Sequence, residues 1–252
     1  MSTNPERGEN DARSGGRRRH HHEHRLEMVR WVAGLGAVTA EALAHREQIS
    51  LPAARGRLQA ALAADLLASA RPLRDWPVLY TVTSAGMRAA GCSLAACNVS
   101  PGNARHLAAC AAVAAAMTRC YPEHVVGGER ELRREEAEHG RRLASADLRA
   151  GRCGEPLPHR PDLVLWPAGC QSARRPLAVE VELTVKAHRR LEAICRAWAR
   201  CDLVAGVLYL AAPQVERPLH RAIERAQAQT RVVALPLGAI PGSAWQAIPS
   251  GA

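Results

Sequence analysis

The chain has 252 residues, which is long enough for one large domain or two small ones. A formal net charge of +10 and a pI of about 9.9 reflect an excess of arginine, which suits a polyanionic partner such as nucleic acid. No apolar run approaches the ~18 residues that a membrane span needs, and the N-terminus has no hydrophobic signal core, so the sequence predicts a soluble, cytoplasmic protein without a membrane partner.

Composition divides the chain into five parts. Residues 1–24 are polar, rich in Gly, Ser and Arg, and lack apolar periodicity, which predicts a disordered basic arm. Residues 25–91 and 104–240 are expected to form two domains. Between them, residues 92–103 read CSLAACNVSPGN, a run of small residues with Pro and Gly that predicts a hinge. Residues 241–252 form a tail.

The first domain is expected to begin with three helices. Apolar residues from Leu26 onward recur at helical spacing, Thr39 is a candidate N-cap of the second helix, and Ser50 is one for the third. Leucines 58, 62 and 66 would form the buried stripe of the third helix. A turn bearing Pro and Arg then leads into an alternating strand at 78–82, and a short helix follows from about Ser84.

This order of three helices followed by strand, turn and strand is typical of a winged helix-turn-helix, and RLQAALAADLL…LYTVTSAG resembles the recognition helix and wing of bacterial winged-helix regulators. In such a fold the third helix enters the major groove and the wing lies on the backbone or in the minor groove. Candidate groove contacts are Arg55, Arg57 and Gln59, and candidate phosphate contacts are Arg71 and Arg74. Two alternatives remain open: these charges solvate a helix face, or the module binds protein.

The second domain alternates helices with short apolar strands, which predicts a mixed sheet flanked by helices and an α+β or α/β class. Helices are expected at 104–120, 186–199 and 218–229. Strands are expected at 124–128, 162–166, 177–183, 204–210 and 231–235, and the segment after residue 128 is highly charged.

Two glutamates lie inside one of these strands, in the segment LAVEVELTVKAHRR that starts at Leu177. Side chains alternate along a strand, so Glu180 and Glu182 share a face with their carboxylates ~7 Å apart. If the preceding strand is a hairpin neighbour, Asp162 can meet them. Three carboxylates at one place repel each other unless a cation lies among them, and oxygen donors suit Mg²⁺ or Mn²⁺. The sequence thus predicts a metal site of Asp162, Glu180 and Glu182.

The pair of segments PDLVLW…LAVEVELTVK resembles the active-site hairpin of the PD-(D/E)xK nuclease superfamily. With the winged helix in front, residues 25–237 resemble the replication-relaxation family of actinobacterial and plasmid proteins. That resemblance implies that Asp162 is the first acid and Glu180 the second, both ligands of Mg²⁺. Glu182 departs from the pattern, because it stands where the superfamily usually has lysine.

Lys186 is the only lysine of the chain. If Thr184 caps the following helix, Lys186 lies in its first turn beside the acids, where it would stabilise a phosphorane-like transition state. Arg189 and Arg190, at the start of that helix, are candidates to hold the DNA backbone, and Glu129 or Glu131 is a weaker candidate for a further metal ligand. The alternative is that the lysine survived by chance at a surface position.

The eight cysteines include no C-x-x-C pair, and their spacing is not that of zinc knuckles. We expect free, mostly buried thiols rather than zinc ligands.

The expected function is that of a DNA-binding protein of the replication-relaxation type, with a nuclease-like domain for Mg²⁺-dependent phosphodiester cleavage. Its expected partner is double-stranded DNA, and a homodimer is one arrangement to test. The alternatives are a catalytically inactive winged-helix regulator of transcription or plasmid replication, and a protein-binding adaptor in plasmid transfer.

Overall fold

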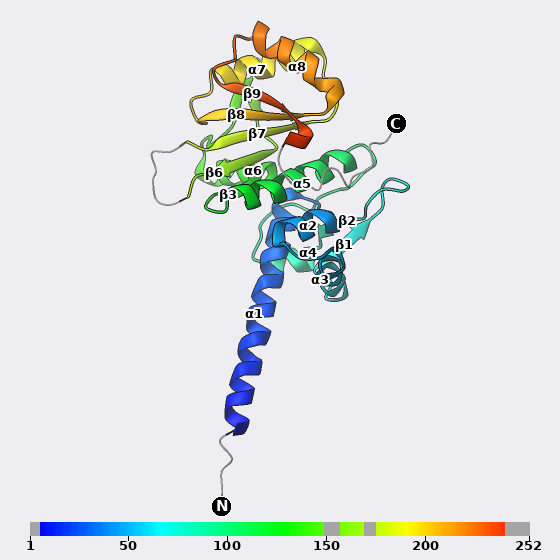
Figure 1. Cartoon of the computed structure of the whole chain (residues 1–252). Helices are drawn as coiled ribbons and strands as arrows, with labels where there is room; N and C mark the ends of the chain where they lie inside the picture. Colours follow the sequence, from blue (N-terminus) through cyan, green and yellow to red (C-terminus); the bar gives the residue numbers. More distant parts are fainter. Residues whose placement is uncertain (1–5, 149–156, 169–174, 240–252) are drawn as a thin grey trace, which may run out of the picture.

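The computed structural model describes residues 6–148, 157–168 and 175–239, and this part of the chain is a mixed α+β fold (Figure 1). Its N-terminal half contains helices α1 (Glu6–Leu35), α2 (Ala40–Glu47) and α3 (Leu51–Ala63), the strands β1 (Leu67–Ala70) and β2 (Leu79–Val82), and helix α4 (Ser84–Ala89). The strands form an antiparallel hairpin, and an isolated bridge from Val38 to Tyr80 adds a third segment to it.

Local capping fixes the starts of the short helices as the sequence predicted. The Thr39 hydroxyl accepts a hydrogen bond from the N–H of Ala42, and the Ser50 hydroxyl accepts one from Ala53. Each bond satisfies a backbone donor that the first helical turn leaves without a partner. The predicted leucine stripe of α3 needs a correction. Its buried residues are Ala54, Leu58 and Ala61, because the helix ends at Ala63 and Leu62 and Leu66 stay half-buried.

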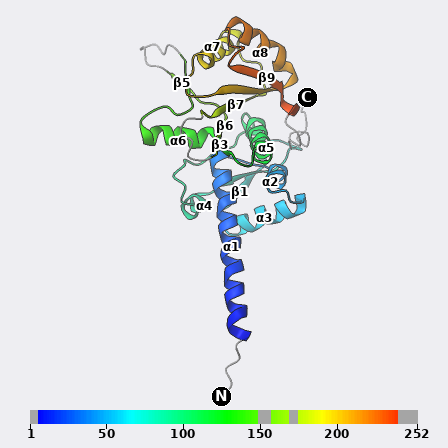
Figure 2. The same cartoon turned by 60° about the vertical axis from the view of Figure 1, so that its left-hand side comes forward.

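Helix α1 corrects the expectation of a disordered arm, because it begins at Glu6 and includes residues 6–24 (Figure 1). Its first part projects away from the rest of the chain in both views (Figure 2). A helix in solvent needs no apolar stripe, and arginine and glutamate are good helix formers. The ion pair between Glu23 and Arg30, at 3.1 Å, joins residues about two turns apart on the helix.

The C-terminal half is built on a five-stranded sheet in the order β3-β6-β7-β8-β9. The strands are β3 (Val125–Gly128), β6 (Leu163–Trp166), β7 (Leu177–Glu182), β8 (Gly206–Ala211) and β9 (Val232–Pro236). The pairs β3–β6 and β6–β7 are antiparallel, whereas β7–β8 and β8–β9 are parallel. A separate hairpin consists of β4 (Ala146–Leu148) and β5 (Leu157–His159).

Helices cover both faces of this sheet (Figures 1 and 2). Helix α5 (Ala104–Cys120) packs on the face that carries Val179 and Val181. Helices α7 (His188–Ala199) and α8 (Pro213–Arg225) pack on the face that carries Ala178 and Tyr209. Helix α6 (Glu129–His139) and the short 3-10 helix η1 (Leu237–Ala239) complete the fold. None of the helices in the described ranges is both long and apolar enough to cross a membrane.

Several element boundaries differ from those expected. The charged segment after residue 128 is helix α6, and the β4–β5 hairpin was not foreseen. Helix α8 was expected to begin at Pro218 but begins five residues earlier, at Pro213. Proline is favoured in the first turn of a helix, and here Pro213 has that position while Pro218 lies inside the helix. Helix α7 begins at His188 rather than at Lys186. The expected tail lies outside the described residues.

One apolar core joins the two halves. Its buried side chains come from α1, α2 and α3, from α5, and from β6, β7 and β8. Residues 92–103, expected as a hinge, contact the folded parts: Cys92 and Leu94 pack against this core, and Arg130 of α6 donates hydrogen bonds to Ala33 O and Ala95 O. The expected linker therefore runs along a surface shared by both halves.

Candidate functional site

The two glutamates of β7 lie in the interior of the fold. Glu180 is 6% exposed and Glu182 is 5% exposed. Their neighbours Val179 and Val181 belong to the apolar core on the α5 side, so the glutamates face the opposite layer, which contains α7. A buried carboxylate is costly unless it is hydrogen-bonded or paired, so the partners of each one define the site.

Glu180 is held by two aromatic side chains. Its Oε1 accepts a hydrogen bond from the indole N–H of Trp198 in α7 at 3.0 Å, and His159 Nε2 of β5 lies 2.7 Å from the same oxygen. The two rings meet edge to face at 5.6 Å. Burial raises the pKa of Glu180, and the carboxylate of Asp162 raises it further, while His159 and Lys186 oppose the rise. This arrangement fixes the carboxylate on the α7 side of β7.

Asp162 immediately precedes β6 and sits across from Glu180 in the register that pairs Leu163 with Val179. Its Oδ2 accepts a hydrogen bond of 2.7 Å from the backbone N–H of Val181, between the two glutamates. Its Oδ1 turns to the α5 side, where it lies 3.0 Å from His106 Nε2. The aspartate thus touches the backbone of β7 while its free oxygen faces another helix.

His106 and Cys110 lie one turn apart on α5, and Cys110 Sγ is 3.5 Å from His106 Nε2. The Cys110 sulfur and the Asp162 carboxylate raise the pKa of His106 to about 11. Burial raises the pKa of the Cys110 thiol to about 11 as well. The two pKa values are linked, because His106 and Cys110 lie against each other and beside Asp162.

Lys186 lies against the other glutamate, with its Nζ in an ion pair with Glu182 Oε2. It does so from the loop after β7, because α7 begins at His188 with Ala187 as N-cap, which corrects the expected cap at Thr184. Burial lowers the pKa of Lys186, and Glu180 and Asp162 oppose this. The only lysine of the chain thus lies within electrostatic range of all three acids.

The remaining candidates near this end of the sheet are placed differently. Arg189 and Arg190 are exposed at the start of α7, where they are accessible to a ligand. Glu131 accepts a hydrogen bond of 3.0 Å from the N–H of Gly128, and Glu129 pairs with Arg133, so both glutamates serve the first turn of α6. We therefore do not count them among the metal ligands.

The predicted acids do not form one ligand set. Among the described residues, potential metal-ligand atoms converge at His106, Cys110 and Asp162, where one atom of each side chain lies within 4.8 Å of the other two. Glu180 and Glu182 are directed to other partners. The three acids therefore supply oxygen donors of the kind that Mg²⁺ prefers, but their arrangement does not fit a common ion.

A second candidate site lies in the N-terminal half. A hollow of about 800 Å³ opens between α3 and the β1–β2 hairpin. Arg55 and Gln59 line it from α3, and Arg71 lines it from the hairpin. All three side chains are exposed, and Glu41 faces Arg55 across 3.7 Å. The structure thus brings three of the five DNA contacts predicted in the N-terminal half to one concave surface.

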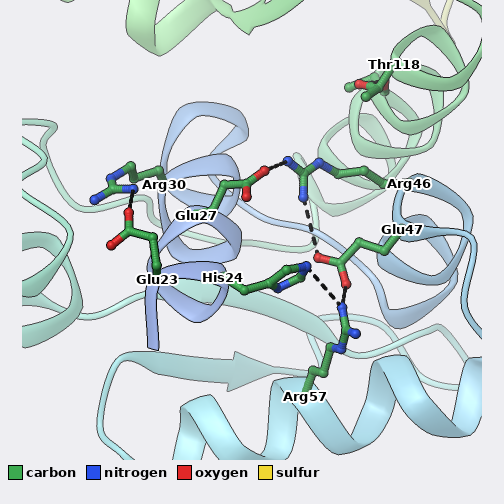
Figure 3. Close-up of polar contacts among 9 residues, drawn as sticks. Glu23, His24, Glu27, Arg30, Arg46, Glu47, Arg57 and Thr118 are labelled. Atoms are coloured by element: carbon green, nitrogen blue, oxygen red, sulfur yellow. Dashed lines mark hydrogen bonds and ion pairs between the residues drawn. The ribbon is translucent and has the colours of Figure 1, made fainter. Parts of the chain in front are cut away.

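The other two predicted contacts lie elsewhere. Arg57 points to the opposite side of α3, where it forms an ion pair with Glu47 and lies 3.5 Å from His24 Nε2 (Figure 3). Glu47 also pairs with Arg46 at 3.4 Å, so Arg57 ties α3 to α2 and α1 (Figure 3). Arg74 is exposed in the loop between β1 and β2 but does not line the hollow.

Four residues that shape the first site were not predicted from the sequence: His106, Cys110, His159 and Trp198. The spacing of His106 and Cys110, four residues apart in a predicted helix, was a usable signal, because such residues share a helix face. No comparable signal links His159 or Trp198 to Glu180, because they come from separate elements.

In comparisons with protein-family models, curated proteins and solved structures, nothing matches this chain.

Proposed function

We propose that this chain is a DNA-binding protein of the replication-relaxation type, whose N-terminal half is a winged helix and whose C-terminal half is a PD-(D/E)xK-like domain. The observation that carries the proposal is the hollow lined by Arg55, Gln59 and Arg71. A winged helix uses the surface between its third helix and its wing to contact a duplex. Arginine and glutamine suit this role, because both hydrogen-bond base edges and arginine also binds phosphates.

Other features agree with this function. The net charge of +10 favours association with a polyanion. The mixed sheet, in which β3, β6 and β7 are antiparallel and β8 is parallel to β7, supports the proposal of a nuclease-like domain. Glu41 at the rim of the hollow is the opposing feature, since its carboxylate repels phosphates unless Arg55 neutralises it.

Fluorescence anisotropy of a labelled duplex with the full-length chain tests the proposal. The double variant Arg55→Ala with Arg71→Ala should bind on the order of tenfold to a hundredfold more weakly. An arginine that contacts a base contributes about 1–3 kcal/mol to binding, and one that contacts a phosphate contributes less. The control is Arg217→Ala with Arg221→Ala, two exposed arginines of α8 that remove the same charge. Equal losses in both double variants would mean that net charge alone drives binding.

Metal-dependent phosphodiester cleavage is a second candidate function. One observation favours it: the only lysine lies on Glu182, within electrostatic range of Glu180 and Asp162. The nuclease resemblance calls for two acids and a lysine. Asp162 and Glu180 would be the acids, and Lys186 would replace the lysine that Glu182 displaces from its usual position. We derive no catalytic step through Mg²⁺, because the oxygen atoms of the three acids do not converge on one place where an ion could bind.

Supercoiled plasmid incubated with the chain and Mg²⁺, Mn²⁺ or a chelator tests this candidate. If the chain cleaves DNA, we expect nicked or linear plasmid in the presence of a metal. We expect no such product with the chelator or with the Glu180→Gln variant. A plasmid that stays supercoiled under all conditions, with a protein that still binds it, leaves DNA binding as the function.

A further inference from the structure

From the geometry of His106, Cys110 and Asp162 we infer a binding site for Zn²⁺ between α5 and the start of β6. This inference is independent of DNA binding. It differs from the Mg²⁺ site that the sequence predicted, because it shares with that site only Asp162 and takes its other two ligands from a helix.

The ligand atoms are spaced as they are around a tetrahedral zinc ion. With Zn–N and Zn–O of about 2.0–2.1 Å and Zn–S of about 2.3 Å, tetrahedral angles place N and O about 3.3 Å apart and N and S about 3.6 Å apart. In the structure, His106 Nε2 lies 3.0 Å from Asp162 Oδ1 and 3.5 Å from Cys110 Sγ. All three atoms lie within 4.8 Å of one another.

Hydrogen bonding alone explains this convergence poorly. Both neighbours approach the same nitrogen of His106, which carries either one proton or one lone pair and cannot serve both along their best directions. A cation at the centre would satisfy the imidazole, the thiolate and the carboxylate together. The site fits a metal better than a three-way hydrogen bond.

Sequence spacing and support also suit a built site. His106 and Cys110 are four residues apart on α5, so the helix holds both on one face. The N–H of Val181 holds Asp162 Oδ2, which orients the other oxygen toward the helix. The Cys110 residue is 6% exposed, whereas the His106 side chain is 41% exposed, so solvent reaches the site from the His106 side, from which a water would supply the fourth ligand.

The donor set selects the class of metal. A thiolate and an imidazole favour a borderline ion such as zinc, whereas Mg²⁺ prefers oxygen donors alone. Binding requires the Cys110 thiol and His106 Nε2 to lose their protons, so metal uptake should release protons.

The full-length chain, stripped with a chelator and titrated with Co²⁺, provides the test. We expect about one equivalent of bound cobalt with a thiolate-to-cobalt charge-transfer band in the near ultraviolet, displaced by Zn²⁺. Cys110→Ser should lose this band, while Cys120→Ser, at the exposed end of the same helix, should keep it. The histidine-rich stretch at 20–24 contains no cysteine, so cobalt bound there gives no such band.

A variant at a partly exposed position guards against a folding artefact. His106→Gln should weaken cobalt binding at least about tenfold with unchanged circular dichroism. The inference is overturned if the wild type shows no thiolate band, or if the band survives in Cys110→Ser. Cys110→Ser should still bind duplex DNA, and the Arg55 and Arg71 double variant should still show the band, so failure of either proposal is recognised separately.

Discussion

Replacement of Arg57 by alanine tests how the two arginines of α3 divide their roles. The sequence placed Arg55 and Arg57 together as groove contacts, but the structure directs Arg57 to Glu47, whose side chain is 6% exposed (Figure 3). Loss of one partner of a buried charged group costs about 1–3 kcal/mol. Because Arg57 is 42% exposed and Arg46 remains on Glu47, solvent screening brings the expected loss to about 1–1.5 kcal/mol.

The matched control is Arg55→Ala on the same helix. Arg55 is 59% exposed and lies 3.7 Å from Glu41, so its loss should change the free energy of unfolding by less than about 0.5 kcal/mol. Urea denaturation followed by circular dichroism measures both variants, and the Arg57 variant should also melt about 2–6 °C lower. Equal stability of the two variants would refute the structural role of Arg57.

Three further predictions concern other parts of the chain. Gly128→Ala should destabilise the fold by about 1–3 kcal/mol in urea denaturation, because a Cβ at position 128 would lie 2.5 Å from Gly34 O. Gly56→Ala should instead stabilise the fold by about 0.5–1 kcal/mol, because the space around Gly56 in α3 is open. Similar effects of the two substitutions would contradict the close approach at Gly128. Burial raises the pKa of Glu131, so the contribution of this carboxyl group to stability is present at low pH and lost as the pH rises above about 4. The free energy of unfolding of Glu131→Gln should therefore increase relative to that of the wild type from about pH 4 to pH 7. A difference between the two proteins that stays constant over this range would count against the prediction. Lys186→Arg should lower any Mg²⁺-dependent plasmid cleavage on the order of a hundredfold without unfolding the protein, whereas full activity would mark the lysine as replaceable.

Much of the fold follows from local sequence signals. Helix α5 has the predicted bounds, Ala104–Cys120, because Pro101 and Gly102 precede it and Pro122 follows it. Helix α6 was missed because Leu132 is its only buried apolar side chain, and ion pairs such as Arg134 with Glu138 support its surface instead. Periodicity cannot reveal a helix whose stability comes mainly from charges and one anchor.

The candidate site was predictable only in part. Alternation along β7 correctly places Glu180 and Glu182 opposite Val179 and Val181, and a hairpin brings Asp162 to the same strand. The direction in which each carboxylate turns was not predictable, because it depends on His106, 56 positions from Asp162, and on Trp198 in α7. Such partners meet only once the sheet and its helices have assembled.

The most direct test of the DNA-binding account is the salt dependence of duplex affinity. The logarithm of the association constant should fall linearly with the logarithm of salt concentration, because each phosphate contact releases counterions. Removing Arg55 and Arg71 should reduce the magnitude of this slope by about 1 to 2, while removing Arg217 and Arg221 of α8 should leave it unchanged. The same slope for the wild type and both double variants, or a wild type that does not bind duplex DNA, would contradict the account.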